Sequence, residues 1–137
     1  MGETYTDITL KNAGDVFMAK RRFIKAAAVR KVTVEALADT GAITLIINER
    51  LRRKLGLRVR QLCDVTFGNN TKEMGKLAGP VEVHWENRAT VCEAMVVSRD
   101  GGVLLGLIPL EGMDLMVDPI GQRLVGKHGD KVVGLVK

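Results

Sequence analysis

Short runs of alternating apolar and polar residues recur along the chain, and residues typical of turns separate them. The clearest run, VTVEALA, covers residues 32–38. Alternation with a period of two places one face of a strand on a core and the other face in solvent. Comparable runs predict strands over residues 5–10, 62–67, 76–85, 90–97 and 115–117, with up to two more over 122–125 and 131–136. The pattern therefore predicts an all-β domain.

The length of 137 residues suffices for one hydrophobic core and is short for two, so we expect a single domain over residues 1–137. One short helix interrupts the predicted strands. Asn48 is a typical N-cap for a helix over Glu49–Leu55, and Gly56 is typical of the position that ends a helix. The basic stretch over residues 16–30 predicts a loop or one helical turn.

The strand predicted over residues 32–38 runs directly into Asp39-Thr40-Gly41. Taken alone, this tripeptide indicates only a turn, because Asp accepts backbone hydrogen bonds and Gly supplies open dihedral angles. The segments around the tripeptide indicate more than a turn. Ala42 and an apolar strand over 43–47 follow, then the capped helix, and the apolar run Leu104-Leu105-Gly106 comes much later in the chain.

With these segments the chain resembles the single-domain aspartic proteases of the retroviral type, in particular their bacterial members. The resemblance is carried by residues 36–42 (ALADTGA), 46–51 (IINERL), 55–57 (LGL), 104–106 (LLG) and 115–119 (LMVDP), and residues 5–20 and 79–97 also look like that group. It implies a closed, β-barrel-like retropepsin fold that forms a homodimer. The implied activity is hydrolysis of a peptide or protein substrate, without a metal or an organic cofactor.

The resemblance also implies roles for individual residues. Asp39 is the one catalytic carboxylate of each subunit, Thr40 ties the two active-site loops together across the dimer axis, and Gly41 lets the backbone approach the carboxylates. The chemistry of amide hydrolysis also favours a pair of carboxylates at the site. Hydrolysis of an amide by water needs one group that accepts a proton and one that donates a proton, and two adjacent carboxylates that share one proton do both.

Substrate contacts are expected from Ala42 and from a hairpin, the flap, that closes over the substrate. The flap is expected to start at Phe67 and to reach Gly75, and its expected contact residues are Phe67, Gly68, Asn69 and Asn70. By the same resemblance, the run over 104–106 packs behind the catalytic loop. We interpret Asp64 as a single charge on a strand and Asp118, before Pro119, as part of a turn.

The remaining chemistry-bearing residues indicate no further site. Cys63, Cys92, His84 and His128 are scattered, which predicts reduced thiols and no metal site. No apolar stretch reaches the roughly 20 residues of a membrane span, so we expect a cytoplasmic protein without a membrane partner.

The net charge of +5 is concentrated in two basic clusters, over residues 20–31 and 50–60. We interpret both clusters as solvated faces, because we expect no aromatic residues interleaved with the charges as stacking platforms. Nucleic acid is therefore not an expected partner. Two alternatives stay open: a non-proteolytic binding or interaction module with the same fold, and a basic β-protein that binds nucleic acid through its Arg-rich helix.

Overall fold

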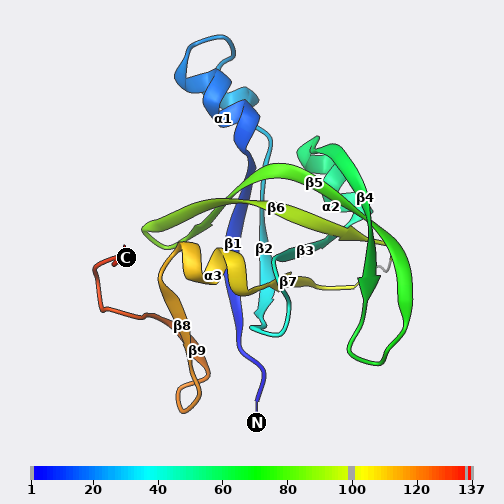
Figure 1. The fold of residues 1–137 in the computed structure, drawn as a ribbon. Helices are drawn as coiled ribbons and strands as arrows, with labels where there is room; N and C mark the ends of the chain where they lie inside the picture. The colour runs from blue at the N-terminus through cyan, green and yellow to red at the C-terminus, as the bar shows by residue number, and fades with distance from the viewer. Residues whose placement is uncertain (1, 99–100, 135, 137) are drawn as a thin grey trace.

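The computed structural model describes residues 2–98, 101–134 and 136. Its main sheet has the strand order β1-β2-β7-β3-β6-β5-β4, and a further pairing of β1 with β5 closes six of these strands into a barrel (Figure 1). The barrel strands are β1 (Tyr5–Asn12), β2 (Lys31–Ala38), β3 (Leu45–Asn48), β5 (Lys72–Trp85), β6 (Arg88–Val97) and β7 (Val103–Leu105). The predicted all-β fold and its closed barrel are confirmed.

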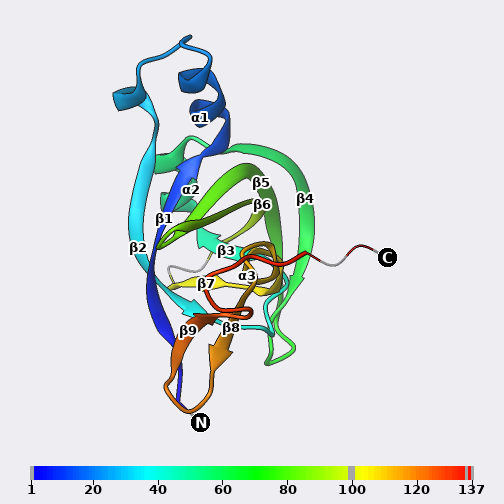
Figure 2. The ribbon, with the colours of Figure 1, turned by 90° about the vertical axis from the view of Figure 1, so that its left-hand side faces the viewer.

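Several elements lie outside this ring of strands. They are β4 (Arg58–Thr66), which pairs with β5, the β8 (Leu115–Asp118) and β9 (Arg123–Gly126) hairpin, and the helices α1 (Ala13–Lys20), η1 (Ala26–Ala28), α2 (Glu49–Leu55) and α3 (Leu107–Gly112). The β8–β9 hairpin and α1 stand at opposite ends of the barrel (Figure 2). No helix in the described part of the chain is long and apolar enough to cross a membrane.

The core fills the barrel because alternate side chains of each strand point inward. In β1, for example, Ile8 and Leu10 are buried while Thr9 between them is not. Each of the six barrel strands contributes fully buried residues to the core, among them Ile8, Leu10, Ala36, Leu45, Ile47, Val81, Val83, Ala94 and Leu105. The period-two pattern of the sequence thus specifies which face of each strand is buried.

Helix α2 begins and ends where the sequence predicts. The Asn48 side chain accepts a hydrogen bond from the Leu51 N–H at 2.9 Å, which satisfies a free donor of the first turn. Gly56 follows the last helical residue with a φ of 63°, a left-handed conformation that glycine adopts without steric cost.

The prediction of only one short helix is wrong. Where a loop or one helical turn was predicted over residues 16–30, the structure has the single turn η1 and also α1 over residues 13–20. Asn12 caps α1 by accepting a hydrogen bond from the Asp15 N–H at 3.0 Å. Helix α3 was not predicted, because its short apolar sequence, LIPLEG, shows no helical pattern of apolar and polar residues. Pro109 is compatible with α3 because it lies in the first turn, where a backbone N–H has no partner within the helix.

The strand predicted over residues 131–136 is also wrong for the residues described; Leu135 lies outside them. The segment makes only an isolated bridge between Lys131 and His128. The Val133 N–H donates to Asp114 Oδ2 at 3.0 Å, so a side chain takes the hydrogen bond that a neighbouring strand would otherwise accept.

Candidate active site

Asp39 lies at the end of β2, where the strand leaves the barrel. The parallel ladder of β2 and β7 ends there, and the Asp39 N–H donates to the Leu105 carbonyl at 3.0 Å. Oδ1 of Asp39 accepts a hydrogen bond from the Gly41 N–H at 2.9 Å, and the Ala42 N–H donates to the Asp39 carbonyl at 3.1 Å. Asp39 is half-buried, and no other residue in the described part of the chain donates a hydrogen bond to its side chain.

The Asp39 loop, residues 39–44, rests on the start of α3. The Leu107 N–H donates to the Ala42 carbonyl at 2.8 Å, and the Ile108 N–H donates to the Ile43 carbonyl at 3.0 Å. Gly106 permits this approach, because a Cβ atom there would lie 2.2 Å from the Thr44 carbonyl oxygen. The run over 104–106 therefore supports the loop from behind.

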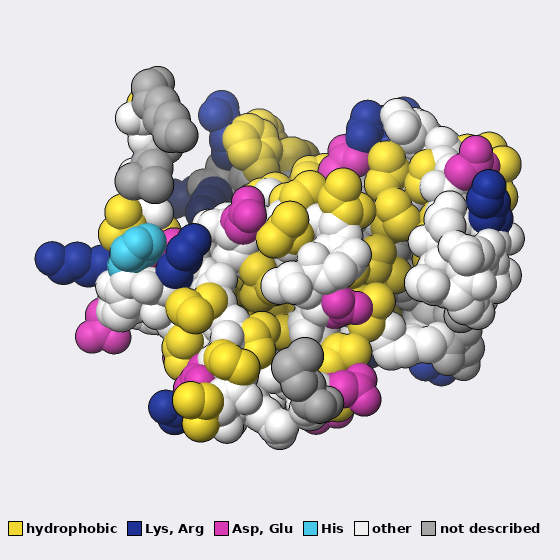
Figure 3. Space-filling model, turned by 60° about the horizontal axis from the view of Figure 1, so that its bottom comes forward, with side chains coloured by type: hydrophobic (Ala, Val, Ile, Leu, Met, Phe, Trp, Pro, Cys, Tyr) yellow, Lys and Arg dark blue, Asp and Glu magenta, His cyan; other side chains and the backbone are white. Residues whose placement is uncertain are grey.

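A groove of about 570 Å³ opens beside Asp39. The Asp39 loop forms one part of its lining, and the end of β4 with the turn after it, residues 64–68, forms another part. Apolar side chains complete the groove: Ile46, Met95, Val97 and Leu104. Hydrophobic side chains gather on this face of the molecule (Figure 3). Ligand-binding sites typically combine mostly apolar walls with a few polar groups, and a groove with Asp39 beside apolar side chains has this composition.

The β4 wall presents a strand edge to the groove. Side chains at successive positions of a strand point to opposite faces, so a wall formed by consecutive residues 64–66 exposes the edge of the strand rather than one face. Strand β4 is the last in the sheet order and pairs only with β5 among the described strands. Its second edge is thus free to pair with an extended peptide.

The predicted flap corresponds to the turn of the β4–β5 hairpin, and only some of its residues line the groove. Phe67 and Gly68 line the groove, whereas Asn69 and Asn70 form the tip of the turn. Asn70 adopts a φ of 65°, and the Asn69 side chain accepts a hydrogen bond from the Thr71 N–H at 3.1 Å. These two residues shape the hairpin and do not line the groove.

The structure brings together most of the predicted site residues. Five of them line one groove: Asp39, Gly41, Ala42, Phe67 and Gly68. Thr40 is exposed and does not line it. Gly75, the expected end of the flap, lies within β5 opposite Cys63, where a Cβ atom would come within 2.5 Å of the Val65 side chain.

Asp64 is the charged groove residue that the sequence analysis missed. It was interpreted as a single charge on a strand, but it lines the same groove as Asp39. A signal was present, because Asp64 lies three residues before Phe67 and any strand that leads into a flap also borders the covered groove. Among the described residues, the groove lining contains these two carboxylates and no Lys, Arg or His, so its described side chains carry only negative charge.

Within the described residues, no group of three or more His, Cys, Asp or Glu side chains could hold a metal ion. The two cysteines are not paired with each other, and burial raises the pKa of the Cys92 thiol above its usual range. A buried thiol with a raised pKa is a poor nucleophile, which argues against Cys92 as a catalytic group.

The sequence was compared with protein-family models and with curated proteins. No protein-family model matches the chain, and no curated protein matches its sequence.

Proposed function

We propose that this protein is an aspartic endopeptidase of the retroviral type, active as a homodimer. The observation that carries the proposal is the position of Asp39, which lies on a Gly-containing turn at a strand end and lines an apolar groove together with the edge strand β4. In the proposed complex, an extended peptide pairs with the edge of β4 and its side chains fill the apolar parts of the groove.

The proposed reaction is hydrolysis of a peptide bond by water. One ionised Asp39 accepts a proton from the water, whose oxygen forms a bond to the carbonyl carbon. A protonated Asp39 from a second subunit donates a hydrogen bond to the carbonyl oxygen and stabilises the tetrahedral intermediate. A proton then reaches the amide nitrogen, the carbon–nitrogen bond breaks, and the carboxylates return to their shared-proton state.

The surroundings of the Asp39 loop support a second copy as the source of the other carboxylate. Exposed apolar side chains border the loop: Ile43 is 62% exposed, Ile108 is 49% exposed and Leu107 is 38% exposed. A symmetric dimer would cover these side chains and place two Asp39 residues near one axis.

The test is cleavage of a peptide library by the purified protein, followed by mass spectrometry. Wild-type protein should cut peptides, and a statine-type mimic of the tetrahedral intermediate should inhibit it. The Asp39→Asn variant should lose at least about a thousandfold in kcat/KM, because the amide keeps the shape of the side chain but cannot exchange the proton. Asp64→Asn is the matched control, and it should retain activity on uncharged peptides.

Cleavage by Asp39→Asn at a rate near that of wild type would remove Asp39 from the reaction. If no peptide is cut but peptides still bind in the groove, the alternative of a non-proteolytic binding module holds instead.

A further inference from the structure

Residues 13–30 leave the ladder between β1 and β2 at its end and return to it at the same place. The last paired residues are Lys11 and Lys31, and the Asn12 N–H donates to the Arg30 carbonyl at 3.0 Å. Between them, α1, a turn and η1 stand away from the barrel (Figures 1 and 2). We name residues 13–30 the basic protrusion.

The basic protrusion is fastened at its base and adds nothing to the core. The Asn12 side chain donates to the Leu55 carbonyl at 2.9 Å, and the Arg30 guanidinium donates to both oxygens of Asp15 at 2.8 and 2.9 Å. None of residues 13–30 is buried. The segment is therefore a defined surface feature that contributes no buried side chain to the core.

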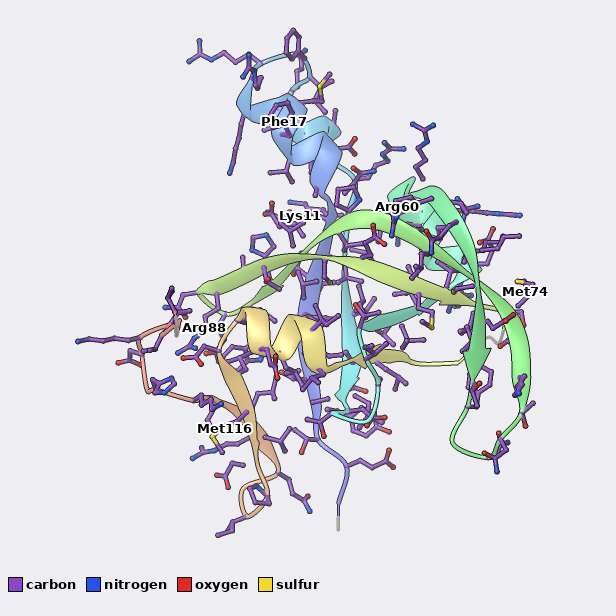
Figure 4. The ribbon with its side chains drawn as sticks, in the orientation of Figure 1. Lys11, Phe17, Arg60, Met74, Arg88 and Met116 are labelled. Atoms are coloured by element: carbon purple, nitrogen blue, oxygen red, sulfur yellow. The ribbon has the colours of Figure 1, made fainter. Side chains whose placement is uncertain are left out.

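Large apolar side chains are exposed on this protrusion. Phe23 is 67% exposed, Phe17 is 58% exposed and Met18 is 39% exposed. The Phe23 N–H donates to the Met18 carbonyl at 2.9 Å, so the three side chains branch from adjacent pieces of backbone. Phe17 lies at the far end of the molecule from Met116 of β8 (Figure 4). Grouped apolar exposure of this kind marks a surface that a partner covers.

Unpaired cations surround the apolar side chains. The protrusion contains five Lys or Arg residues and one Asp, a net charge of +4, against +5 for the whole chain. Its one acidic residue, Asp15, is paired with Arg30. The other four cations make no ion pair with any described residue: Lys20, Arg21, Arg22 and Lys25. The Arg21 guanidinium lies 5.6 Å from the centre of the Phe17 ring.

We propose that the basic protrusion binds the surface of an anionic lipid bilayer. Cations attract anionic headgroups, while Phe and Met side chains enter the boundary between headgroups and acyl chains. Sites for single-stranded nucleic acid also combine cations with aromatic rings, but they place them along a groove that follows the strand. The protrusion is convex, and its apolar group includes Met18, so it fits a planar partner better.

Two expectations from the sequence change here. The expectation that no aromatic residue lies among the cations of the first basic cluster was wrong, because Phe17 and Phe23 are both exposed beside them. The expectation of no membrane partner considered only membrane spans, whereas the proposed contact is peripheral.

The proposed contact leaves the groove open. Strand β2 has Lys31 at the protrusion and runs to the turn that holds Asp39, and its eight residues cover about 26 Å at the rise of a strand. A molecule held at the protrusion therefore keeps the Asp39 groove away from the bilayer. The inference does not depend on the proposed peptidase activity.

The test is flotation of the full chain with two kinds of vesicle, one of phosphatidylcholine alone and one of equimolar phosphatidylcholine and phosphatidylserine. Wild type should float only with the anionic vesicles, and added salt should weaken the binding. A Lys20→Gln, Lys25→Gln variant should bind about 30-fold more weakly, because each cation near an anionic surface contributes about a fivefold factor. Lys127→Gln, Lys131→Gln is the matched control, since it removes the same charge from exposed positions elsewhere.

A Phe17→Ser, Phe23→Ser variant tests the apolar contribution and should bind at least about tenfold more weakly. Circular dichroism checks that every variant is folded. Equal flotation with both kinds of vesicle, or unchanged binding of either protrusion variant, would overturn the proposal. So would binding of single-stranded oligothymidylate through the same residues with no binding to vesicles, which would indicate a nucleic-acid site.

Discussion

The Gly41 N–H donates a hydrogen bond to Oδ1 of Asp39 at 2.9 Å, and this bond orients a half-buried carboxylate at the mouth of the groove. The bond holds one oxygen of the carboxylate through the backbone of its own turn. The other oxygen is left without a donor among the described residues, and in the proposed reaction it is the one that takes part in proton transfer.

The first prediction concerns the source of the second carboxylate. If wild-type and Asp39→Asn subunits are mixed in equal amounts and exchange freely, roughly a quarter of the dimers carry two Asp39 residues. Activity per wild-type subunit should fall by about half, because mixed dimers contain an incomplete site. Peptidase activity is measured before and after exchange, and subunit exchange is followed separately by mass spectrometry of differently labelled chains. Activity that stays proportional to the wild-type protein would show that each chain carries a complete site.

The second prediction concerns Asp64 and the substrate. Because the described residues that line the groove include two carboxylates and no cation, peptides with Lys or Arg near the cleaved bond should be preferred. Asp64→Asn should reduce this preference by about fivefold and leave cleavage of uncharged peptides nearly unchanged. The measurement is kcat/KM for matched peptides that carry Lys or Gln at one position. Loss of all cleavage in Asp64→Asn would instead make Asp64 the partner of Asp39 within one chain.

The third prediction concerns the support behind the Asp39 loop. Gly106→Ala should lower the free energy of unfolding by about 2–3 kcal/mol, because the new methyl group would collide with the Thr44 and Ala42 carbonyl oxygens. Gly102→Ala is the matched control, since among the described residues no atom other than those of its chain neighbours lies within 4 Å of a Cβ atom at that position. Urea unfolding of the two variants measures the difference. Equal stability would show that the loop and α3 do not pack as closely as described.

The fourth prediction concerns stability at low pH. The Arg52 guanidinium, which donates to both oxygens of Glu49 at 2.7 Å, lowers the pKa of that carboxyl from 4.5 to about 2, and Lys76 contributes. A pKa lowered in the folded state adds stability above pH 4.5, and this contribution is lost as the pH falls towards 2. The pKa shift of Glu49 corresponds to a contribution of at most about 3 kcal/mol to the free energy of unfolding. Solvent screening of this partly exposed pair reduces that contribution to about 1 kcal/mol.

Glu49→Gln should therefore destabilise the protein by about 1 kcal/mol at neutral pH and by much less near pH 2. Urea unfolding at several pH values measures this change. Glu111→Gln serves as the control, because Glu111 is exposed and forms no ion pair with a described residue. A Glu49→Gln effect of the same size at every pH would rule out the ion pair as its cause.

The sequence by itself determined the elements whose signals are local. The alternation over residues 32–38 specified β2, and the caps Asn48 and Gly56 specified both ends of α2. The turn at Asp39 was equally predictable, because a strand period ends there and a tripeptide typical of turns follows. These features depend on contacts between residues a few positions apart, so the sequence shows them directly.

Only the tertiary structure decided which distant residues meet. It placed Asp64 in the same groove as Asp39, brought Gly106 against the Asp39 loop, and turned the apolar run over 107–112 into a helix. It also left Phe17 and Phe23 in solvent, although their apolar character alone would favour a core. The physical reason is that burial and proximity depend on how the barrel closes, and closure is set by pairings between strands far apart in the sequence, such as β1 with β5.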